Sequence, residues 1–236
     1  MRKISAINFA KQVLQKTRLL SPVSHLLNYV HPSFDGLHLD NLKAITDAIQ
    51  AAPSGDYYEF GVYNGFSLWF ATEVAYALKK DIKFYGFDSF DGLPCPEGLD
   101  CQYSDELGVP WMRGSLSAGI KLVEQNLVRH KAPMDKIFLV KGFYKKVLNG
   151  ELIRKYKMGK ASVIMVDCDM YSSTKEVLEF IKPLIQIGTI ILFDDWRLTD
   201  DAAGEQKAFA EWDADVETEA FSDFGIGKGF RIRKAN

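Results

Sequence analysis

The sequence predicts a doubly wound α/β domain built on a mostly parallel sheet of seven strands. From residue 57 onward, short apolar runs alternate with segments of helical periodicity, which is typical of parallel strands joined by crossover helices. Two further β-like runs close the chain with no room for a helix between them, so we expect them to form an antiparallel pair. A chain of 236 residues, 47% of them hydrophobic, is sufficient for one large core.

The expected elements follow one another in a regular order. The five strands that precede the closing pair are residues 57–62, 83–88, 137–141, 162–167 and 189–193. The helices are residues 66–79, 117–130, 144–156, 174–184 and 203–212, and the closing runs are residues 215–221 and 229–233. Because crossover helices keep the first five strands parallel, their carboxyl ends should share one edge of the sheet.

We expect residues 1–52 to form a helical extension and residues 53–236 to form the main domain. The first twenty residues have an apolar and a basic helical face, and no acidic residue precedes Asp35. Such a helix can bind an anionic membrane surface, but it more often packs on its own domain or on a second subunit. Peripheral membrane contact and a homo-oligomer therefore both stay open. A second helix is expected at about residues 40–52.

Composition excludes several classes of protein. The formal charge of −2, from 29 basic and 31 acidic residues, gives no field that would attract a nucleic acid. Cys95, Cys101 and Cys168 are an odd number without CxxC spacing, so neither a disulfide framework nor a zinc site is indicated, and a reducing cytoplasm is expected. No apolar run reaches the roughly 18 residues of a membrane span, and no secretion signal is recognisable.

A loop of unusual length follows the second expected strand. Residues 92–114 contain three prolines and several glycines and show no helical or strand periodicity. Long connections inside a compact domain are commonly lids or binding loops. A disordered insertion is the alternative, although aromatic and apolar residues give this loop something to pack.

A glycine-containing turn joins the first strand to its helix, with the sequence EFGVYNG at residues 59–65. Gly61 permits a tight turn, and Gly65 permits close approach of a ligand to the helix N-terminus. The spacing departs from GxGxxG, and Glu59 directly precedes the turn. Both features favour the methionine end of S-adenosylmethionine over a pyrophosphate, although a plain connection has the same look.

Asp88 ends the second strand. A carboxylate in this position can accept both hydroxyls of a ribose, as acidic residues do in nucleotide-binding sheets. The alternative is an ordinary turn or helix-capping aspartate. Because Gly61 and Asp88 follow neighbouring strands, where open α/β sheets bind ligands, we favour the ribose role.

Four carboxylates follow the fourth and fifth strands: Asp167, Asp169, Asp194 and Asp195. Crowded like charges need a compensating cation or proton, and all-oxygen ligands suit a hard divalent cation such as Mg²⁺. Helix capping is the simpler alternative. A bound metal would lower the pKa of a substrate hydroxyl, which could then attack a methyl sulfonium.

The sequence does not single out a general base. Tyr171, Lys141, His31 and His38 are candidates, and none has a distinctive spacing. Catalytic residues therefore stay unassigned. Among the tryptophans, Trp196 is the best candidate for lining a ring pocket because it follows the aspartate pair directly.

With these residues in view, the chain resembles the macrocin O-methyltransferase (TylF/MycF-type) family of class I, Rossmann-like S-adenosylmethionine-dependent methyltransferases. Its members are metal-dependent enzymes that methylate sugar hydroxyls of natural products. The resemblance spans about residues 55–212. It is carried by EFGVYNG at residues 59–65, FDSFDGLP at 87–94, VDCDMYSST at 166–174 and the later aspartate pair.

The resemblance implies specific roles. It makes Asp167, Asp194 and Asp195 metal ligands, Asp88 the ribose contact, Gly61 and Gly65 the cofactor turn, and Lys141 and Gly142 the adenine contacts. Glu59 and Asp167 complete the expected cofactor site. The chain differs from the family pattern at Cys168, where glycine is common, and at Trp196, where tyrosine is frequent. It also has no histidine after His130 to match the late base of some relatives.

The expected function is an S-adenosylmethionine- and Mg²⁺-dependent O-methyltransferase. The acceptor would be a small molecule or glycan, with methyl transfer to a sugar hydroxyl. A nicotinamide-dependent oxidoreductase is the first alternative, because the strand, glycine turn and acid alone are compatible with it. A non-catalytic protein that keeps the cofactor-binding fold is the second.

Overall fold

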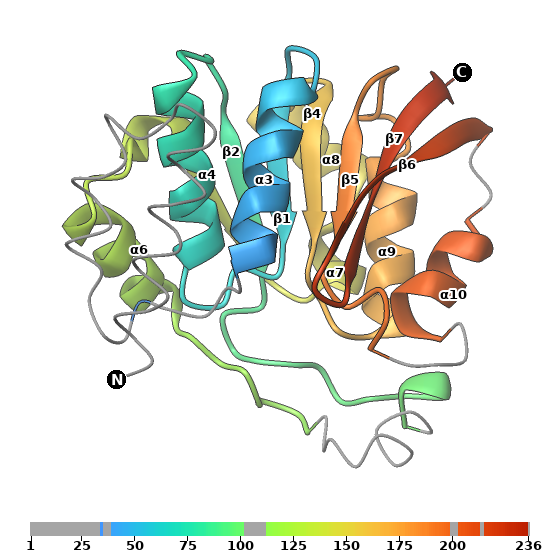
Figure 1. The fold of residues 1–236 in the computed structure, drawn as a ribbon. Helices are drawn as coiled ribbons and strands as arrows, with labels where there is room; N and C mark the ends of the chain where they lie inside the picture. The colour runs from blue at the N-terminus through green and yellow to red at the C-terminus, as the bar shows by residue number, and fades with distance from the viewer. Residues whose placement is uncertain (1–33, 35–38, 102–111, 199–202, 213–214, 236) are drawn as a thin grey trace, which may run out of the picture.

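The computed structural model describes residues 34, 39–101, 112–198, 203–212 and 215–235. It shows one seven-stranded sheet covered by helices on both faces (Figure 1). The strand order is β3-β2-β1-β4-β5-β7-β6, with β1 to β5 parallel and β7 antiparallel to both β5 and β6. The predicted doubly wound sheet with an antiparallel edge is confirmed.

The strands lie where the apolar runs predict them. They are β1 (Asp56–Phe60), β2 (Phe84–Asp88), β3 (Ile137–Lys141), β4 (Ala161–Val166), β5 (Ile190–Phe193), β6 (Val216–Phe224) and β7 (Gly227–Ala235). The central strands β1 and β4 are almost entirely buried because helices cover both faces of the sheet. The last two strands are longer than expected, since they pair with each other along their whole length.

The helices form two layers. They are α3 (Leu39–Ala51), α4 (Phe66–Ala77), α6 (Ile120–Arg129), α7 (Tyr144–Val147), α8 (Gly150–Tyr156), α9 (Tyr171–Ile181) and α10 (Gly204–Ala210), with a 3₁₀ turn at Met134–Lys136. Side chains of α3, α4 and α6 share one hydrophobic core with the sheet, while those of α8, α9 and α10 share the other (Figure 1). These layers hold the strand ends in fixed positions.

The predicted single helix at residues 144–156 is wrong. The chain breaks after Val147, and α8 starts anew at Gly150. The side chain of Asn149 accepts hydrogen bonds from the amides of Glu151 and Leu152, both at 3.0 Å. Asparagine is a strong N-cap residue because it satisfies amides that have no partner within the helix. The Asn149 cap therefore starts a new helix, although the helical periodicity of the sequence is continuous here.

The described part of the expected N-terminal extension packs into the main core. Leu42, Ile45 and Ile49 of α3 are buried in the same cluster as α4 and the sheet. Phe34 stacks on the ring of His130 with centroids 4.3 Å apart. The basic amphipathic helix predicted for the first twenty residues lies outside the described residues, and the domain boundary after residue 52 stays a prediction.

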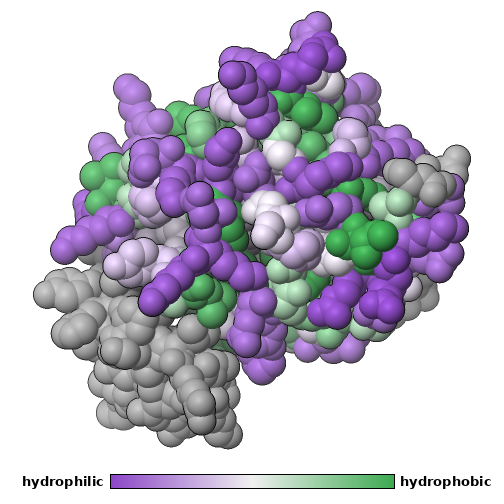
Figure 2. Space-filling model, turned by 90° about the horizontal axis from the view of Figure 1, so that it is seen from above, coloured by the Kyte–Doolittle hydropathy of each residue, from purple (hydrophilic) through white to green (hydrophobic). Residues whose placement is uncertain are grey.

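The surface opposite the carboxyl ends of the parallel strands is mainly hydrophilic, with small separate apolar patches (Figure 2). Scattered exposed apolar side chains are normal for a folded domain. In the part of the chain that the structure describes, no helix combines the length and apolar character needed to cross a membrane.

The carboxyl ends of the parallel strands continue to pair after the strands end. The amide of Asp167 donates to the carbonyl of Phe60 at 2.8 Å, and the amide of Gly61 donates to Phe87 at 3.0 Å. Gly61 has a φ of 94°, and a Cβ added there would lie 1.6 Å from the carbonyl oxygen of Asp167. Only glycine fits where these two backbones approach, so Gly61 fixes how the strand ends meet.

We predict that Gly61→Ala destabilises the protein by about 3 kcal/mol or more, because the methyl group overlaps backbone atoms in an unfavourable φ region. Chemical denaturation measures the change in the free energy of unfolding. Gly119→Ala is the matched control, since φ is −61° at Gly119 and no atom of the described residues lies within 4 Å of the added Cβ. An equally small loss for both variants would contradict this account of Gly61.

Candidate functional site

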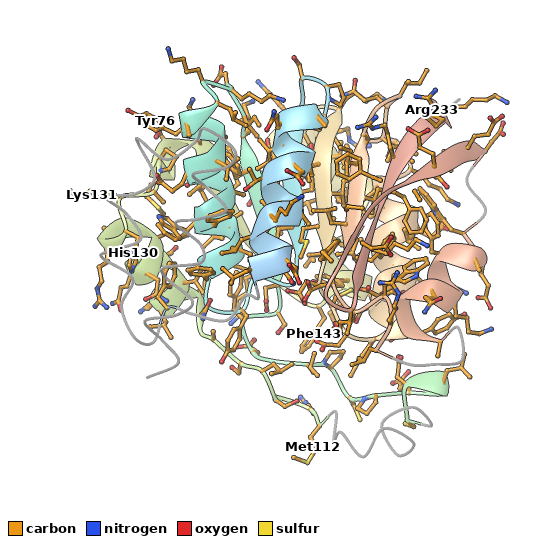
Figure 3. The ribbon with its side chains drawn as sticks, viewed as in Figure 1. Tyr76, Met112, His130, Lys131, Phe143 and Arg233 are labelled. Carbon is orange, nitrogen blue, oxygen red and sulfur yellow. The ribbon has the colours of Figure 1, made fainter. Side chains whose placement is uncertain are left out.

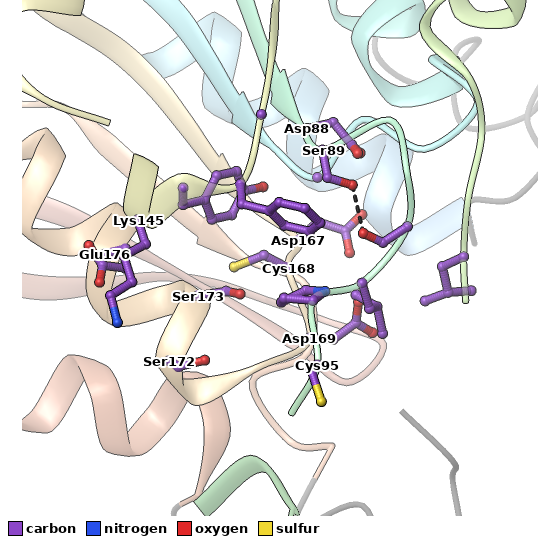
Figure 4. Close-up of a pocket in the computed structure, with 18 of the residues that line it drawn as sticks. Asp88, Ser89, Cys95, Lys145, Asp167, Cys168, Asp169, Ser172, Ser173 and Glu176 are labelled. Atoms are coloured by element: carbon purple, nitrogen blue, oxygen red, sulfur yellow. Dashed lines mark hydrogen bonds between the residues drawn. The ribbon is translucent and has the colours of Figure 1, made fainter. Parts of the chain in front are cut away.

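A cavity of about 500 Å³ lies at the carboxyl ends of the parallel strands (Figure 4). Its walls come from the loops after all five parallel strands. The lining residues are Gly61, Tyr63, Asp88, Ser89, Gly92, Leu93, Pro94, Cys95, Glu97, Leu116, Gly142, Phe143, Tyr144, Lys145, Lys146, Asp167, Cys168, Asp169, Ser172, Ser173, Glu176 and Asp194. A cavity of this size can enclose a nucleoside-sized ligand.

Asp88 joins two loops at the cavity wall. One carboxylate oxygen accepts from the amides of Val62 and Tyr63 at 2.9 and 3.0 Å, and the other accepts from Phe90 at 2.7 Å. An ionised carboxylate has about four acceptor positions, so these three bonds leave capacity for a ligand hydroxyl. The turn role and the ligand role, which the sequence presents as alternatives, are therefore compatible.

The other glycines of the expected site have different positions. Gly142 lines the cavity, and its φ of 148° and the contact of an added Cβ with Val147 at 2.4 Å explain why glycine stands there. Gly65 is the N-cap residue of α4 and does not line the cavity. A Cβ added at Gly65 would lie 2.9 Å from the side chain of Val123 on α6. Gly65 thus shapes the turn between β1 and α4 without contacting the cavity.

Lys141, expected near the adenine, is not among the residues that line the cavity. Its ammonium forms an exposed ion pair with Asp91 at 2.8 Å. Exposed pairs of this kind contribute little to stability. At this strand end the structure brings Gly142, and not the lysine side chain, to the cavity.

Glu59 lies beneath the cavity floor, fully buried between β1 and α4. It accepts hydrogen bonds from the hydroxyls of Tyr57 and Ser67 at 2.9 and 2.8 Å. Burial raises the pKa of Glu59 to about 8, although these two hydrogen bonds act in the opposite direction. Its side chain does not line the cavity, so it supports the glycine turn from the core.

The fold brings the four aspartates together, as the strand order predicts. Asp167, Asp169 and Asp194 line the cavity, whereas Asp195 is not among the lining residues. Burial raises the pKa of Asp167 well above its usual range, and the neighbouring Asp194 and Asp195 raise it further. Burial and Asp194 raise the pKa of Asp169 to about 6. This concentration of negative charge favours binding of a proton or a cation.

Two residues that the sequence does not single out contact the aspartate pair. The side-chain amide of Asn41, from α3, donates to a carboxylate oxygen of Asp194. Glu205, from α10, is 1% exposed and accepts from the backbone amide of Asp195 at 3.0 Å. Burial, followed by the charge of Asp195, raises the pKa of Glu205 well above its usual range. In the sequence, Glu205 looks like an ordinary acid in the first turn of a helix.

The donor chemistry of this cluster fits a hard divalent cation. Carboxylate oxygens are the preferred ligands of Mg²⁺. Asp195 Oδ2 and Glu205 Oε1 are buried without a hydrogen-bond partner among the described residues, so a cation would satisfy them. Within the same residues, no three His, Cys, Asp or Glu side chains are already arranged to hold one metal ion.

The opposite wall comes from residues that follow β3 and begin α9, which the sequence also did not single out. Figure 4 places Lys145 and Glu176 on one side of Asp167, Cys168 and Asp169, with Asp88 and Ser89 on the other. Phe143 lies at the edge of the sheet that faces the long loop (Figure 3). Only their position just after a strand end could have marked these residues.

Of the four candidates for a general base, the structure describes Tyr171 and Lys141, and neither lines the cavity. The hydroxyl of Tyr171 donates to Glu211 and accepts from Lys175 at 3.1 Å, which ties α9 to the chain after α10. Lys141 is paired with Asp91. His31 and His38 lie outside the described residues. The base stays unassigned.

Comparison with known proteins relates most of the chain to one family. Residues 35–218 match the family model described as macrocin-O-methyltransferase (TylF). Over 163 residues the chain is 29% identical to 8-demethyl-8-(2,3-dimethoxy-alpha-L-rhamnosyl)-tetracenomycin-C 4'-O-methyltransferase of Streptomyces olivaceus. The matched region covers 68% of this chain and 60% of that protein. It is 24% identical to mycinamicin III 3''-O-methyltransferase of Micromonospora griseorubida over 67% of this chain and 62% of that protein.

The chain thus spans only about three fifths of the length of these two relatives. Among solved structures, the O-methyltransferase NovP superposes with a TM-score of 0.69 at 19% identity, over 83% of this chain and 81% of that one. At this identity the superposition supports the fold, and it leaves the substrate open.

The raised pKa of the buried Glu59 should make the stability of the protein depend on pH. Because the pKa of Glu59 is about 8 in the folded protein and near 4.5 ordinarily, the folded state binds more protons than the unfolded state between these values. The free energy of unfolding should therefore fall as pH rises through this window.

We predict that Glu59→Gln, which has no proton to lose, reduces this fall by about 1 kcal/mol or more between about pH 5 and about pH 8. Denaturant titrations at both values measure it. The exposed Glu124 on α6 supplies the control variant Glu124→Gln, for which the pH dependence of the wild type is expected. Equal pH dependence in wild type and Glu59→Gln would rule out this assignment.

Proposed function

Because the chain belongs to the macrocin O-methyltransferase family, we propose that it transfers a methyl group from S-adenosylmethionine to a sugar hydroxyl of a glycan or secondary metabolite. The observation that carries this proposal is the cavity between the Gly61 turn and Asp88, on adjacent strand ends of a doubly wound sheet. Ligands of such sheets bind at this edge.

The cofactor position follows from the cavity walls. Asp88 would accept hydrogen bonds from the ribose, while the methionine end would lie over Gly61 and Asp167, and adenine would lie near Gly142 and Phe143. Glu59 and Gly65 would act from below by shaping the turn. The sulfonium makes the methyl carbon electrophilic, so the main task of the protein is to position an acceptor oxygen in line with it.

A sugar hydroxyl is the proposed acceptor because both relatives bear the names of O-methyltransferases that act on glycosylated natural products. Asp194, at the end of β5, lines the same cavity, where an acceptor could approach the proposed cofactor. During transfer the acceptor oxygen bonds to the methyl carbon, the bond from carbon to sulfur breaks, and the hydroxyl proton must leave. The products are the methyl ether, S-adenosylhomocysteine and one proton, which leaves to the solvent.

We further propose that Asp167, Asp194 and Asp195 hold Mg²⁺ or a similar divalent cation. The support is the shared burial of negative charge, together with Asp195 Oδ2, which has no hydrogen-bond partner among the described residues. Such an ion would supply Lewis acidity that lowers the pKa of a bound hydroxyl. Asn41 and Glu205 keep the aspartate pair oriented through their hydrogen bonds to Asp194 and Asp195.

Ligand binding separates this function from the two alternatives. We predict that calorimetry detects micromolar binding of S-adenosylhomocysteine and no binding of NAD⁺, and that Asp88→Ala weakens the first by about 1–3 kcal/mol through loss of a charged hydrogen-bond acceptor. Binding of NAD⁺ alone would favour an oxidoreductase. Binding of neither ligand would favour a non-catalytic protein that keeps the cofactor-binding fold.

The metal proposal has a separate test. We predict that Asp194→Asn removes Mg²⁺-dependent methyl transfer to glycosylated acceptors while the dissociation constant of S-adenosylhomocysteine changes no more than a few-fold, since Asp194 is assigned to the acceptor side. Radiolabelled methyl transfer and calorimetry give the two readouts. Full activity of Asp194→Asn in the presence of a chelator would argue against a metal at this site.

A further inference from the structure

The segment Gly92–Cys101, here called the strap, contributes residues to the wall of the cavity. It leaves the end of β2 and runs below the sheet edge to a short helical turn beneath α9 and α10 (Figure 1). Leu93, Pro94, Cys95 and Glu97 of the strap line the cavity. The strap therefore forms part of one wall of the cavity.

The strap is firmly attached where it begins. The amide of Leu93 donates to the carbonyl of Ser115, and the amide of Gly114 donates to Leu93, both at 2.9 Å. A Cβ added at Gly92 would lie 2.5 Å from backbone atoms of Gly114, so the two arms of the loop are in backbone contact here. The hydroxyl of Ser89 also donates to Gly92 at 2.6 Å.

The other end of the strap is held by one buried side chain. Asp100 is fully buried, and its two carboxylate oxygens accept from the amides of Tyr171 and Ser172 at 2.8 and 3.2 Å. These amides begin α9, whose N-cap residue, Met170, makes no side-chain capping bond. Asp100 therefore supplies from the strap the cap that α9 lacks locally.

This contact joins two walls of the same cavity. Ser172 and Ser173 of α9 line the cavity on one side, and Cys95 and Glu97 of the strap line it on the other. Between the described residues, the hydrogen bonds that tie the far half of the strap to the rest of the molecule run through Asp100. Loss of this carboxylate would release one wall and uncap the helix that carries the other.

We propose that Asp100 is a positioning residue of the cofactor site, which holds the strap over the bound nucleoside and thereby slows its release. The inference rests on the proposed binding of S-adenosylmethionine in this cavity. The proposed effect is on the rate of ligand dissociation more than on the rate of association. The contact between Asp100 and the start of α9 would have to break before the strap moves and the ligand leaves.

The test is stopped-flow measurement of S-adenosylhomocysteine dissociation from the full-length chain. Asp100→Ala should dissociate about tenfold faster than wild type, as expected for loss of two charge-assisted hydrogen bonds that hold the strap. Asp100→Asn keeps one carbonyl acceptor and should give an intermediate rate. If Asp100→Ala does not fold, an unchanged dissociation rate in Asp100→Asn overturns the proposal.

Asn149→Ala is the matched control. It also removes two hydrogen bonds from a helix N-terminus, but α8 does not line the cavity. Its melting temperature should fall about as much as that of Asp100→Ala, while its dissociation rate stays at the wild-type value. Equal acceleration in both variants would show a general effect of destabilisation and would overturn the role of Asp100.

The two proposals fail in different ways. If wild type binds S-adenosylhomocysteine and Asp100→Ala releases it at the same rate, the role of Asp100 is wrong and the proposed function stands. If wild type does not bind S-adenosylhomocysteine, the proposed cofactor is wrong, and the role of Asp100 is overturned with it.

Discussion

The backbone contact between Gly61 and Asp167 is the constraint on which the rest of the site depends. At this point β1 and β4 end, and the segments that follow them turn to opposite faces of the sheet. The amide of Asp167 still donates to the carbonyl of Phe60. Any side chain at position 61 would meet the carbonyl of Asp167. Because the ends of β1 and β4 are held together here, the loops that follow them start from fixed positions. These loops then separate, and the cavity lies between them.

Burial of carboxylates at this edge opposes folding and favours ligand binding. Asp167 and Glu205 have pKa values raised chiefly by burial, and each lies near the aspartate pair. Such groups destabilise the folded protein unless a proton or cation accompanies them. Helices from both layers support the cluster, through Asn41 on one side and Glu205 on the other, so the site depends on packing across the whole sheet.

The sequence predicts the sheet well because strand and helix periodicities are local properties. It also predicts that Asp88, Asp167 and Asp194 converge, since parallel strands bring their carboxyl ends to one edge. It fails at Asn149, where one side chain interrupts a continuous helical pattern. It does not anticipate the ion pair between Lys141 and Asp91, while the role of Lys141 as an adenine contact stays a prediction. Asn41, Asp100 and Glu205 are missed because their roles depend on contacts between distant segments, which one sequence does not specify.

The most direct test of the account is a crystal structure of the protein with S-adenosylhomocysteine bound. We expect the ligand in the cavity at the carboxyl ends of β1 to β4, with the ribose hydroxyls on the Asp88 carboxylate and the sulfur above the turn at Gly61. A ribose held elsewhere, or a ligand outside this cavity, would contradict the central role assigned to this edge of the sheet.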